Sequence, residues 1–247
     1  MFKHQVHLGQ ISDLHIGGAG ELVEGIDTRA QFLRVLAHVQ TLNLDLLVLS
    51  GDLANNEESE AYEFIARAMA GYPKDWCVMA GNHDRVETMS RFFEMKKYGD
   101  AYFYRRLVKG KPVLFLDSSS YTIPGNQLDW VREQAAELRE EFLLFVHHPV
   151  CLCGHAFMDA RYPLKNRDEV QAAFQGIKNL RFIFTGHYHT EMEVDWLDKK
   201  VYAAPAAFMQ LDPFTPGFRV ADTRPAWRNI LWGDRSLQTS VHFPGCV

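Results

Sequence analysis

The chain has 247 residues, of which 47% are hydrophobic and 23% are charged, an ordinary composition for a globular protein. Its net charge of −5 provides no overall basic field, so we expect no nucleic-acid partner. No apolar stretch approaches the roughly 20 residues that cross a bilayer, and the start MFKHQVHLGQ lacks the apolar region of a signal peptide. We therefore expect a cytoplasmic protein without a membrane partner, folded as a single domain over residues 1–247.

Short apolar runs alternate with helical patterns over most of the chain, which predicts an α/β protein. Asp27 and Thr28 can cap a helix whose apolar residues recur at i, i+3, i+4 and i+7 from Phe32. The same spacing predicts a second helix around 61–68, and a third is expected near 86–95. Strands are expected at 5–11, 46–49 and 76–80, and the continuous apolar run at 46–49 is typical of a strand buried on both faces.

In the second half of the chain, Lys109-Gly110 predicts a hairpin turn between strands at 102–106 and 113–116. Asn126 can cap another helix, which buries an apolar face from Leu128 to Leu138. Residues 191–247 are rich in strand and turn signals, so we expect an antiparallel element there. The remaining elements expected before it are strands at 143–146 and 181–184, and a helix around 170–177.

Polar residues of the kinds that bind metals recur in five short blocks, and four of these blocks directly follow an apolar run. Strand ends on one edge of a parallel sheet lie side by side, so the blocks can meet there. Carboxylate, imidazole and amide groups that converge on one point predict a metal site, and their number suggests two ions. The blocks contain Asp13 and His15, then Asp52, then Asn82, His83 and Asp84, then His147 and His148, and finally His187 and His189.

Two of the blocks carry a spacing that suits ligands. In Asp13-x-His15 and His187-x-His189, alternate residues of an extended chain point the same way, so both side chains of a pair can hold one cation. A buried Asp52 needs a cation or an arginine partner, and its two oxygens can bridge two ions. Each block alone also occurs in ordinary loops; the ordered set is what indicates the site.

The block Gly81-Asn82-His83-Asp84 supplies further groups. Asn82 offers a neutral oxygen ligand, and His83 can lie beside the ions and donate a proton. The ligands are nitrogen and oxygen atoms without a thiolate, which favours Mn, Fe, Zn or Co over a structural zinc–cysteine site. Cys151 and Cys153 either rim the site or are ordinary reduced thiols of a loop.

The motifs D-L-H, G-D, G-N-H-D, H-H-P and G-H-x-H, in this order over residues 11–190, resemble those of the calcineurin-like metallophosphoesterase family. The resemblance implies a two-sheet α/β sandwich flanked by helices, with a dinuclear metal centre at the strand ends. It assigns Asp13, His15, Asp52 and His189 to one ion. It assigns Asp52, Asn82, His147 and His187 to the other, and it leaves His148 as a neighbour.

This resemblance implies a hydrolase in which a hydroxide shared by two ions attacks phosphorus in line with the leaving oxygen. Asn82 would help to neutralise phosphoryl charge. His83, steered by Asp84, would protonate the leaving oxygen or stabilise the transition state. Relatives often dimerise, so a homodimer is one expectation.

The short length resembles that of bacterial class III cyclic-nucleotide phosphodiesterases and glycerophosphodiesterases, as does Gln210 with the segment Gly217–Arg219. We therefore expect a small-molecule phosphodiester, including a cyclic nucleotide, as the substrate. A phosphomonoesterase and a non-catalytic scaffold of the same fold are the alternatives. The candidate substrate contacts are His148, His155, Arg161, Tyr162 and Gln210. In the loop that carries His155, Arg161 and Tyr162, the arginine and the tyrosine could grip a phosphate or stack on a base.

Overall fold

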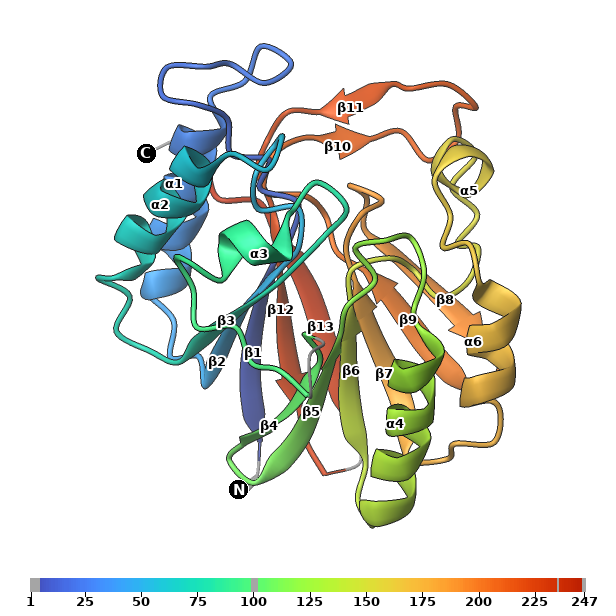
Figure 1. The fold of residues 1–247 in the computed structure, drawn as a ribbon. Coiled ribbons are helices and arrows are strands. Elements are labelled where there is room, and N and C mark those ends of the chain that lie inside the picture. The colour runs from blue at the N-terminus through green and yellow to red at the C-terminus, as the bar shows by residue number, and fades with distance from the viewer. Residues whose placement is uncertain (1–4, 99–101, 235, 246–247) are drawn as a thin grey trace.

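The computed structural model describes residues 5–98, 102–234 and 236–245, and its strands form two main sheets (Figure 1). The first sheet runs in the order β13 (Leu237–His242), β12 (Trp227–Trp232), β1 (Val6–Ile11), β2 (Leu46–Ser50) and β3 (Trp76–Met79). Strands β1, β2 and β3 are parallel, and β12 is antiparallel to both of its neighbours. This sheet therefore brings three strands of the first third of the chain beside two from its end.

The second sheet runs in the order β4 (Tyr104–Val108), β5 (Lys111–Leu116), β6 (Phe142–Val146), β7 (Leu180–Thr185), β9 (Lys199–Ala203) and β8 (Met192–Trp196). Its four central strands are parallel, and the two edge strands are antiparallel to their neighbours. A separate small hairpin joins β10 (Gln210–Leu211) to β11 (Val220–Asp222). The parallel strands of both sheets end on the same side of the molecule, at the top of Figure 1.

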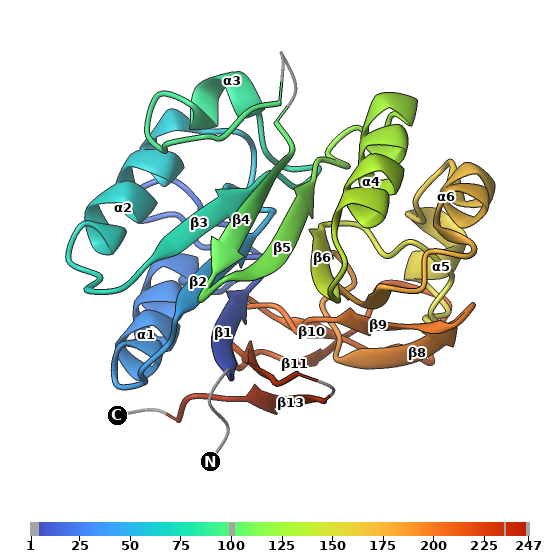
Figure 2. The ribbon, with the colours of Figure 1, turned by 90° about the horizontal axis from the view of Figure 1, so that it is seen from below.

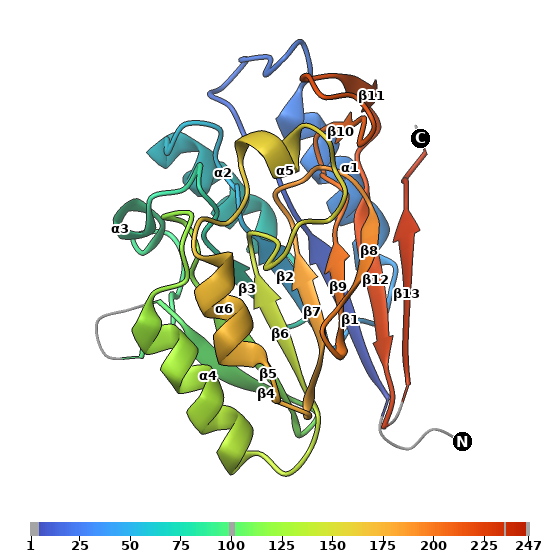
Figure 3. The same cartoon turned by 90° about the vertical axis from the view of Figure 1, so that its right-hand side faces the viewer.

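Helices cover the outer face of each sheet (Figure 2). Helices α1 (Thr28–Gln40), α2 (Ser59–Met69) and α3 (Val86–Met89) pack on the first sheet. Helices α4 (Gly125–Glu137) and α6 (Arg167–Phe174) pack on the second, whereas the short helix α5 (Met158–Arg161) lies near the strand ends (Figure 3). A third apolar cluster fills the space between the two sheets. The expected two-sheet α/β sandwich flanked by helices is confirmed.

The alternation of side chains along each strand explains the continuous apolar runs. In β2, Leu46 and Val48 belong to the cluster between the sheets, whereas Leu47 and Leu49 belong to the cluster under the helices. Both faces of the strand are buried, which explains why its first four positions, 46–49, are all apolar. Each buried leucine or valine contributes about 1.5–3 kcal/mol relative to an exposed one.

Three details differ from the sequence-based expectations. Helix α3 ends at Met89 instead of near residue 95, because the chain turns there and packs Phe93 against Tyr62, with ring centroids 6.1 Å apart. Asn126 lies inside α4, whose N-cap is Pro124, so it does not cap that helix. Strand β13 had no predicted counterpart, because its polar alternation at a sheet edge resembles a loop.

The described helices include none that is both long and apolar enough to cross a bilayer.

Candidate metal centre

All five polar blocks lie directly after parallel strands. Strands β1, β2 and β3 lead into the first three blocks, and β6 and β7 lead into the last two. Backbone hydrogen bonds tie neighbouring blocks together: Asp13 N donates to Gly51 O at 3.0 Å, His15 N to Asp52 O at 2.9 Å, and Gly186 N to His147 O at 2.9 Å. The two sheets thus converge on one site from opposite sides.

The backbone of this site is strained at most of the predicted ligands. Five of them have positive φ, a region that costs a residue with a β-carbon on the order of 1–3 kcal/mol. Such a cost persists only where the surrounding structure enforces the conformation, and it is typical of functional sites. The residues are Asp13 (φ 55°), His15 (44°), Asp52 (50°), His187 (68°) and His189 (50°).

Glycines before the ligands allow the blocks to approach one another. A β-carbon on Gly51 would lie 2.4 Å from His147 Nδ1, and one on Gly81 would lie 2.2 Å from Asp52 Oδ1. One on Gly186 would lie 1.9 Å from Ser12 Oγ. These distances are far shorter than any non-bonded contact, so the close approach of the ligands requires glycine at these positions.

One group of donor atoms comes from Asp13, His15 and His189, whose ligand atoms lie within 4.8 Å of one another. His15 Nε2 is 3.1 Å from His189 Nε2, which in turn is 3.5 Å from Asp13 Oδ1. All three side chains are buried. The Asp13 carboxylate also accepts the N–H of His187 at 3.0 Å, which links this group to the next.

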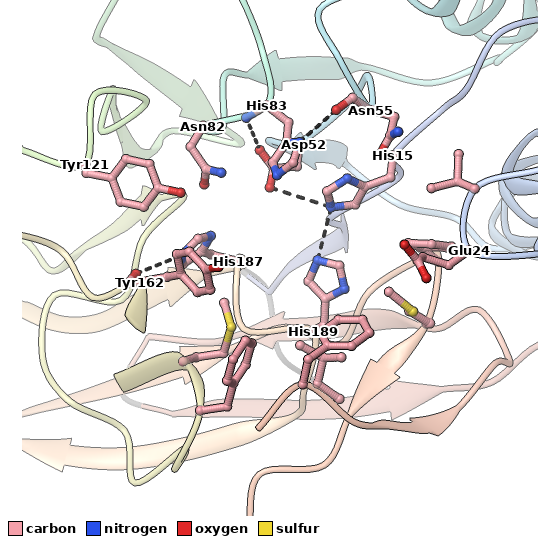
Figure 4. A pocket seen from close by; sticks show the side chains of 17 residues that line it. His15, Glu24, Asp52, Asn55, Asn82, His83, Tyr121, Tyr162, His187 and His189 are labelled. Carbon is pink, nitrogen blue, oxygen red and sulfur yellow. Dashed lines mark hydrogen bonds and ion pairs between the residues drawn. The ribbon is translucent and has the colours of Figure 1, made fainter. Parts of the chain in front are cut away.

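A second group comes from Asp52, His147 and His187, again within 4.8 Å. Asp52 Oδ2 is 3.3 Å from His147 Nε2 and 3.7 Å from His15 Nε2, so one carboxylate lies between the two groups (Figure 4). A third overlapping group joins His15 and Asp52 to His83. The arrangement offers two adjacent positions for cations with Asp52 shared.

The hydrogen bonds of the imidazoles leave ligand atoms free to face the centre. His147 Nδ1 donates to Ser50 O at 2.8 Å, and His187 Nε2 donates to Tyr162 O at 2.9 Å. The opposite nitrogens, His147 Nε2 and His187 Nδ1, can therefore carry lone pairs. His147 Nε2 and Asn82 Oδ1 are buried and lack a hydrogen-bond partner among the described residues. Unsatisfied buried acceptors are costly, and metal ions would satisfy both, so the residues fit a metal site.

The pKa values of the candidate ligand histidines also fit a metal site. Burial lowers the pKa of His15, His187 and His189 to about 3, so these imidazoles are neutral and able to bind metals near pH 7. Burial also favours the neutral form of His147, but the charge and hydrogen bond of Asp52, the charge of Asp13 and the hydrogen bond to the Ser50 carbonyl together outweigh it and raise the pKa of His147 to about 9. The site therefore stabilises added positive charge, as a metal centre must.

His83 lies at the exposed side of the site, and its orientation differs from the expected one. Its backbone N–H donates to Asp52 Oδ1 at 2.8 Å, and its Nδ1 donates to Asn55 O at 2.7 Å. The carboxylate of Asp84 instead accepts hydrogen bonds from backbone N–H groups and from Tyr62. The expectation that Asp84 steers the His83 ring is therefore wrong, because the carbonyl of Asn55 occupies that position.

A pocket of about 480 Å³ opens over these ligands (Figure 4). His83, Asn82 and Asp52 line it together with His15, His187 and His189. The rest of the lining is largely apolar and aromatic, and consists of Val23, Tyr121, Phe157, Met158, Tyr162, Phe208, Met209, Leu211 and Phe218, with Glu24 and Asn55 as further polar residues.

Of the candidate substrate contacts, only Tyr162 lines the pocket. Arg161 is exposed at the end of α5 and is not part of the lining. Gln210 is buried and bonds the backbone of Ala206 and Arg224, which is a structural role.

His148 and His155 are both buried and outside the pocket lining. His148 Nδ1 shares a hydrogen bond of 2.8 Å with Ser118 Oγ, and its ring centroid is 4.2 Å from that of His187. His148 therefore packs against the candidate metal ligand His187 and helps to hold its ring in place. The centroid of the His155 ring lies 5.7 Å from that of Tyr188.

Several lining residues escaped the sequence analysis. Tyr121 follows β5, a parallel strand beside β6, so the rule of strand ends could have found its loop. Asn55 lies three residues after Asp52 in the same loop. Glu24 and Phe208 carried no signal, because their positions depend on how two distant loops pack together.

Comparison with known proteins agrees with this geometry. A family model described as calcineurin-like phosphoesterase matches residues 6–191. A Fibrobacter succinogenes protein named a probable cyclic nucleotide phosphodiesterase is 44% identical over 245 residues, covering 98% of this chain and 96% of that protein. The 3′,5′-cyclic adenosine monophosphate phosphodiesterase CpdA of Escherichia coli is 28% identical over 250 residues, covering 96% and 90%.

Solved structures share the fold at low sequence identity. A dimetal phosphatase from Danio rerio superposes with a TM-score of 0.66 at 12% identity, over 97% of this chain and 99% of that one. A purple acid phosphatase from yellow lupin superposes with a TM-score of 0.69 at 12% identity, over 98% and 52%. With the family model covering most of its length, the chain belongs to the calcineurin-like phosphoesterase family of hydrolases.

Proposed function

We propose that this protein hydrolyses small phosphodiesters, with 3′,5′-cyclic nucleotides as the preferred class, at a centre of two metal ions. The names of the relatives in Fibrobacter succinogenes and Escherichia coli support this substrate class. The observation that carries the proposal is the composition of the pocket, in which buried metal-ligand groups form the floor and aromatic and apolar side chains form the wall.

The wall suits a diester better than a monoester. Among the described residues that line the pocket, none is lysine or arginine. A phosphomonoester dianion would therefore meet no lysine or arginine side chain there. A diester carries a single negative charge and two organic groups, and Phe157, Tyr162 and Phe218 form a run of aromatic rings beside the floor, with centroids 5.6 and 6.1 Å apart. Such rings, like Phe208 on the side of His15, can bind a flat apolar part of a substrate.

In the proposed centre, Asp13, His15, Asp52 and His189 hold one ion, and Asp52, Asn82, His147 and His187 hold the other. When bound, the ions supply Lewis acidity and lower the pKa of a water nucleophile. Their identity among Mn, Fe, Zn and Co follows from supply as well as from ligands.

The chain's own residues orient the substrate and move protons. The hydrogen bond from Nδ1 to Asn55 O fixes the His83 ring at the pocket. When His83 is protonated, its Nε2–H is then available to the leaving oxygen. Asp84 is a positioning residue, because it holds the backbone of Leu53, next to Asp52, and of Gly81.

A metal-reconstituted screen tests the proposal. The purified protein is treated with chelator, reloaded with Mn, Fe, Zn or Co, and assayed with bis(4-nitrophenyl) phosphate, 4-nitrophenyl phosphate and 3′,5′-cyclic AMP. We expect diester turnover to exceed monoester turnover, with two ions per chain by elemental analysis. Preference for the monoester would favour the phosphomonoesterase alternative, and inactivity with full metal content would favour the scaffold.

The homodimer and the cytoplasmic location stay predictions. Size-exclusion chromatography with light scattering tests the first, and cell fractionation tests the second.

A further inference from the structure

The pocket has one charged side chain that the metal centre does not explain. Glu24 lines the pocket on the side of His15 and His189, whereas Tyr121 and Tyr162 lie on the opposite side (Figure 4). The Glu24 side chain is exposed, and no hydrogen bond or ion pair engages its carboxylate within the described part of the chain. An additional carboxylate beside a site for anionic substrates repels them, unless the substrate donates a hydrogen bond to that carboxylate.

The backbone fixes Glu24 in place. Val23 N donates to Ile26 O at 3.0 Å and Ile26 N donates to Val23 O at 2.8 Å, which closes a two-residue turn. Glu24 and Gly25 have φ of +48° and +78°, the pattern of a type I′ turn. Glycine, asparagine and aspartate are the usual residues at the first of these positions, so glutamate there is strained.

Apolar packing anchors this turn to the pocket wall. Val23 is only 8% exposed and packs in one cluster with Ala206, Phe208 and Met209. The Phe208 ring also lies 5.5 Å from that of His15. Phe208 therefore connects the metal-ligand floor to the turn, and a flat group that extends from a phosphate on the floor would pass over Phe208 and end at Glu24.

We propose that Glu24 is a specificity-determining residue that accepts a hydrogen bond from a donor on the organic part of the substrate. On a cyclic nucleotide, the donor is either the exocyclic amine of the base or the 2′-hydroxyl of the ribose. This inference rests on the proposed function, because it names the part of the diester that the same pocket selects. A carboxylate acceptor recognises a donor and rejects an analogue that lacks it.

The experiment compares Glu24→Ala with Glu21→Gln on four substrates. Glu21 is a matched control in the same loop: its carboxylate accepts Gly18 N at 2.7 Å, which glutamine can also do, and it does not line the pocket. The substrates are cyclic AMP, its 2′-deoxy analogue, its 6-chloropurine analogue and bis(4-nitrophenyl) phosphate, which has no donor. Calorimetry with the Rp phosphorothioate of cyclic AMP gives Kd, and elemental analysis gives the metal content.

We expect Glu24→Ala to lower kcat/KM for cyclic AMP by about 10- to 100-fold, the usual effect of one hydrogen bond to a charged group. Kd should rise in parallel, while turnover of bis(4-nitrophenyl) phosphate and metal content stay unchanged. With the wild type, kcat/KM for either the 2′-deoxy or the 6-chloropurine analogue should be lower than that for cyclic AMP by a similar factor. Glu24→Ala should not lower kcat/KM for that analogue any further. That analogue identifies the donor.

Different failures have different meanings. A wild type that turns over no diester overturns the proposed function and this inference with it. If the wild type hydrolyses cyclic AMP but Glu24→Ala lowers kcat/KM equally for all four substrates, or for none of them, only the role of Glu24 is overturned. The same holds if Glu21→Gln reproduces the effect.

Discussion

The carboxylate of Asp84 accepts a hydrogen bond of 3.1 Å from the hydroxyl of Tyr62, which ties the third ligand block to helix α2. The same carboxylate accepts the N–H groups of Leu53, Ala54 and Gly81 at 2.9–3.1 Å. One buried acid thus holds the loops that carry two ligands, Asp52 and Asn82.

Asp84→Asn should weaken both folding and metal binding. The amide has one acceptor oxygen, so its NH₂ group would face an N–H donor, and an unsatisfied buried group costs about 1–3 kcal/mol. Metal affinity should fall about 10- to 100-fold, as for other groups that orient ligands. Denaturant titration and metal titration measure the two effects. Tyr62→Phe is the control, which removes one donor and should leave metal affinity within about threefold. Unchanged metal affinity in Asp84→Asn would contradict the positioning role.

His83→Ala should spare metal content and slow turnover according to the leaving group. Loss of a general acid costs about 10²–10⁴-fold when the leaving oxygen needs a proton, as in a cyclic nucleotide. The loss should be much smaller for 4-nitrophenolate, which leaves without one. Parallel kinetics on cyclic AMP and bis(4-nitrophenyl) phosphate test this, and equal losses of metal and of both activities would rule against it.

Gly81→Ala should disrupt the centre through sterics alone. Its β-carbon would lie 2.4 Å from the backbone nitrogen of Asp52, which cannot rotate away. Such overpacking costs about 1–3 kcal/mol, and the shift of Asp52 should reduce metal content. Gly71→Ala is the matched control, because its β-carbon would meet nothing within 4 Å. Thermal unfolding and elemental analysis should separate the two variants; similar behaviour would refute the packing explanation.

Alkaline pH should destabilise the protein above about pH 9. Burial raises the pKa of Cys77 from 9.0 to about 11 and that of Tyr72 from 10.0 to about 12. The unfolded chain releases these protons at the lower values, so between pH 9 and 11 the folded state binds more protons. The free energy of unfolding therefore falls as pH rises.

Thermal unfolding at pH 7.5–10.5 checks this prediction, with Cys77→Ala for comparison. Because the variant lacks the Cys77 thiol, its free energy of unfolding should fall less steeply with pH than that of the wild type, by up to about 1.4 kcal/mol per pH unit. Parallel curves for the wild type and the variant would show that Cys77 does not contribute.

The positions of the parallel strands and the order of the ligand blocks were predictable from the sequence, because most strands buried on both faces leave a continuous apolar run, as 46–49 does in β2. The partner of His83 was not, since a backbone carbonyl such as that of Asn55 has no signature in the sequence. The exposure of Arg161 and the structural bonds of Gln210 depend likewise on how loops fold back. Glu24 illustrates the limit most clearly, because its position at the pocket follows from the packing of Val23 against a loop almost 200 residues away.

Strand β1 pairs with β12 on one side and β2 on the other. During synthesis on the ribosome, one edge of β1, the strand that leads to Asp13 and His15, therefore stays uncovered until residues 227–232 have emerged. An uncovered edge invites pairing with other chains. A chain that ends before residue 227 would already carry every ligand block but would lack the strand that covers this edge of the sheet, and it would expose β1 to pairing with other chains.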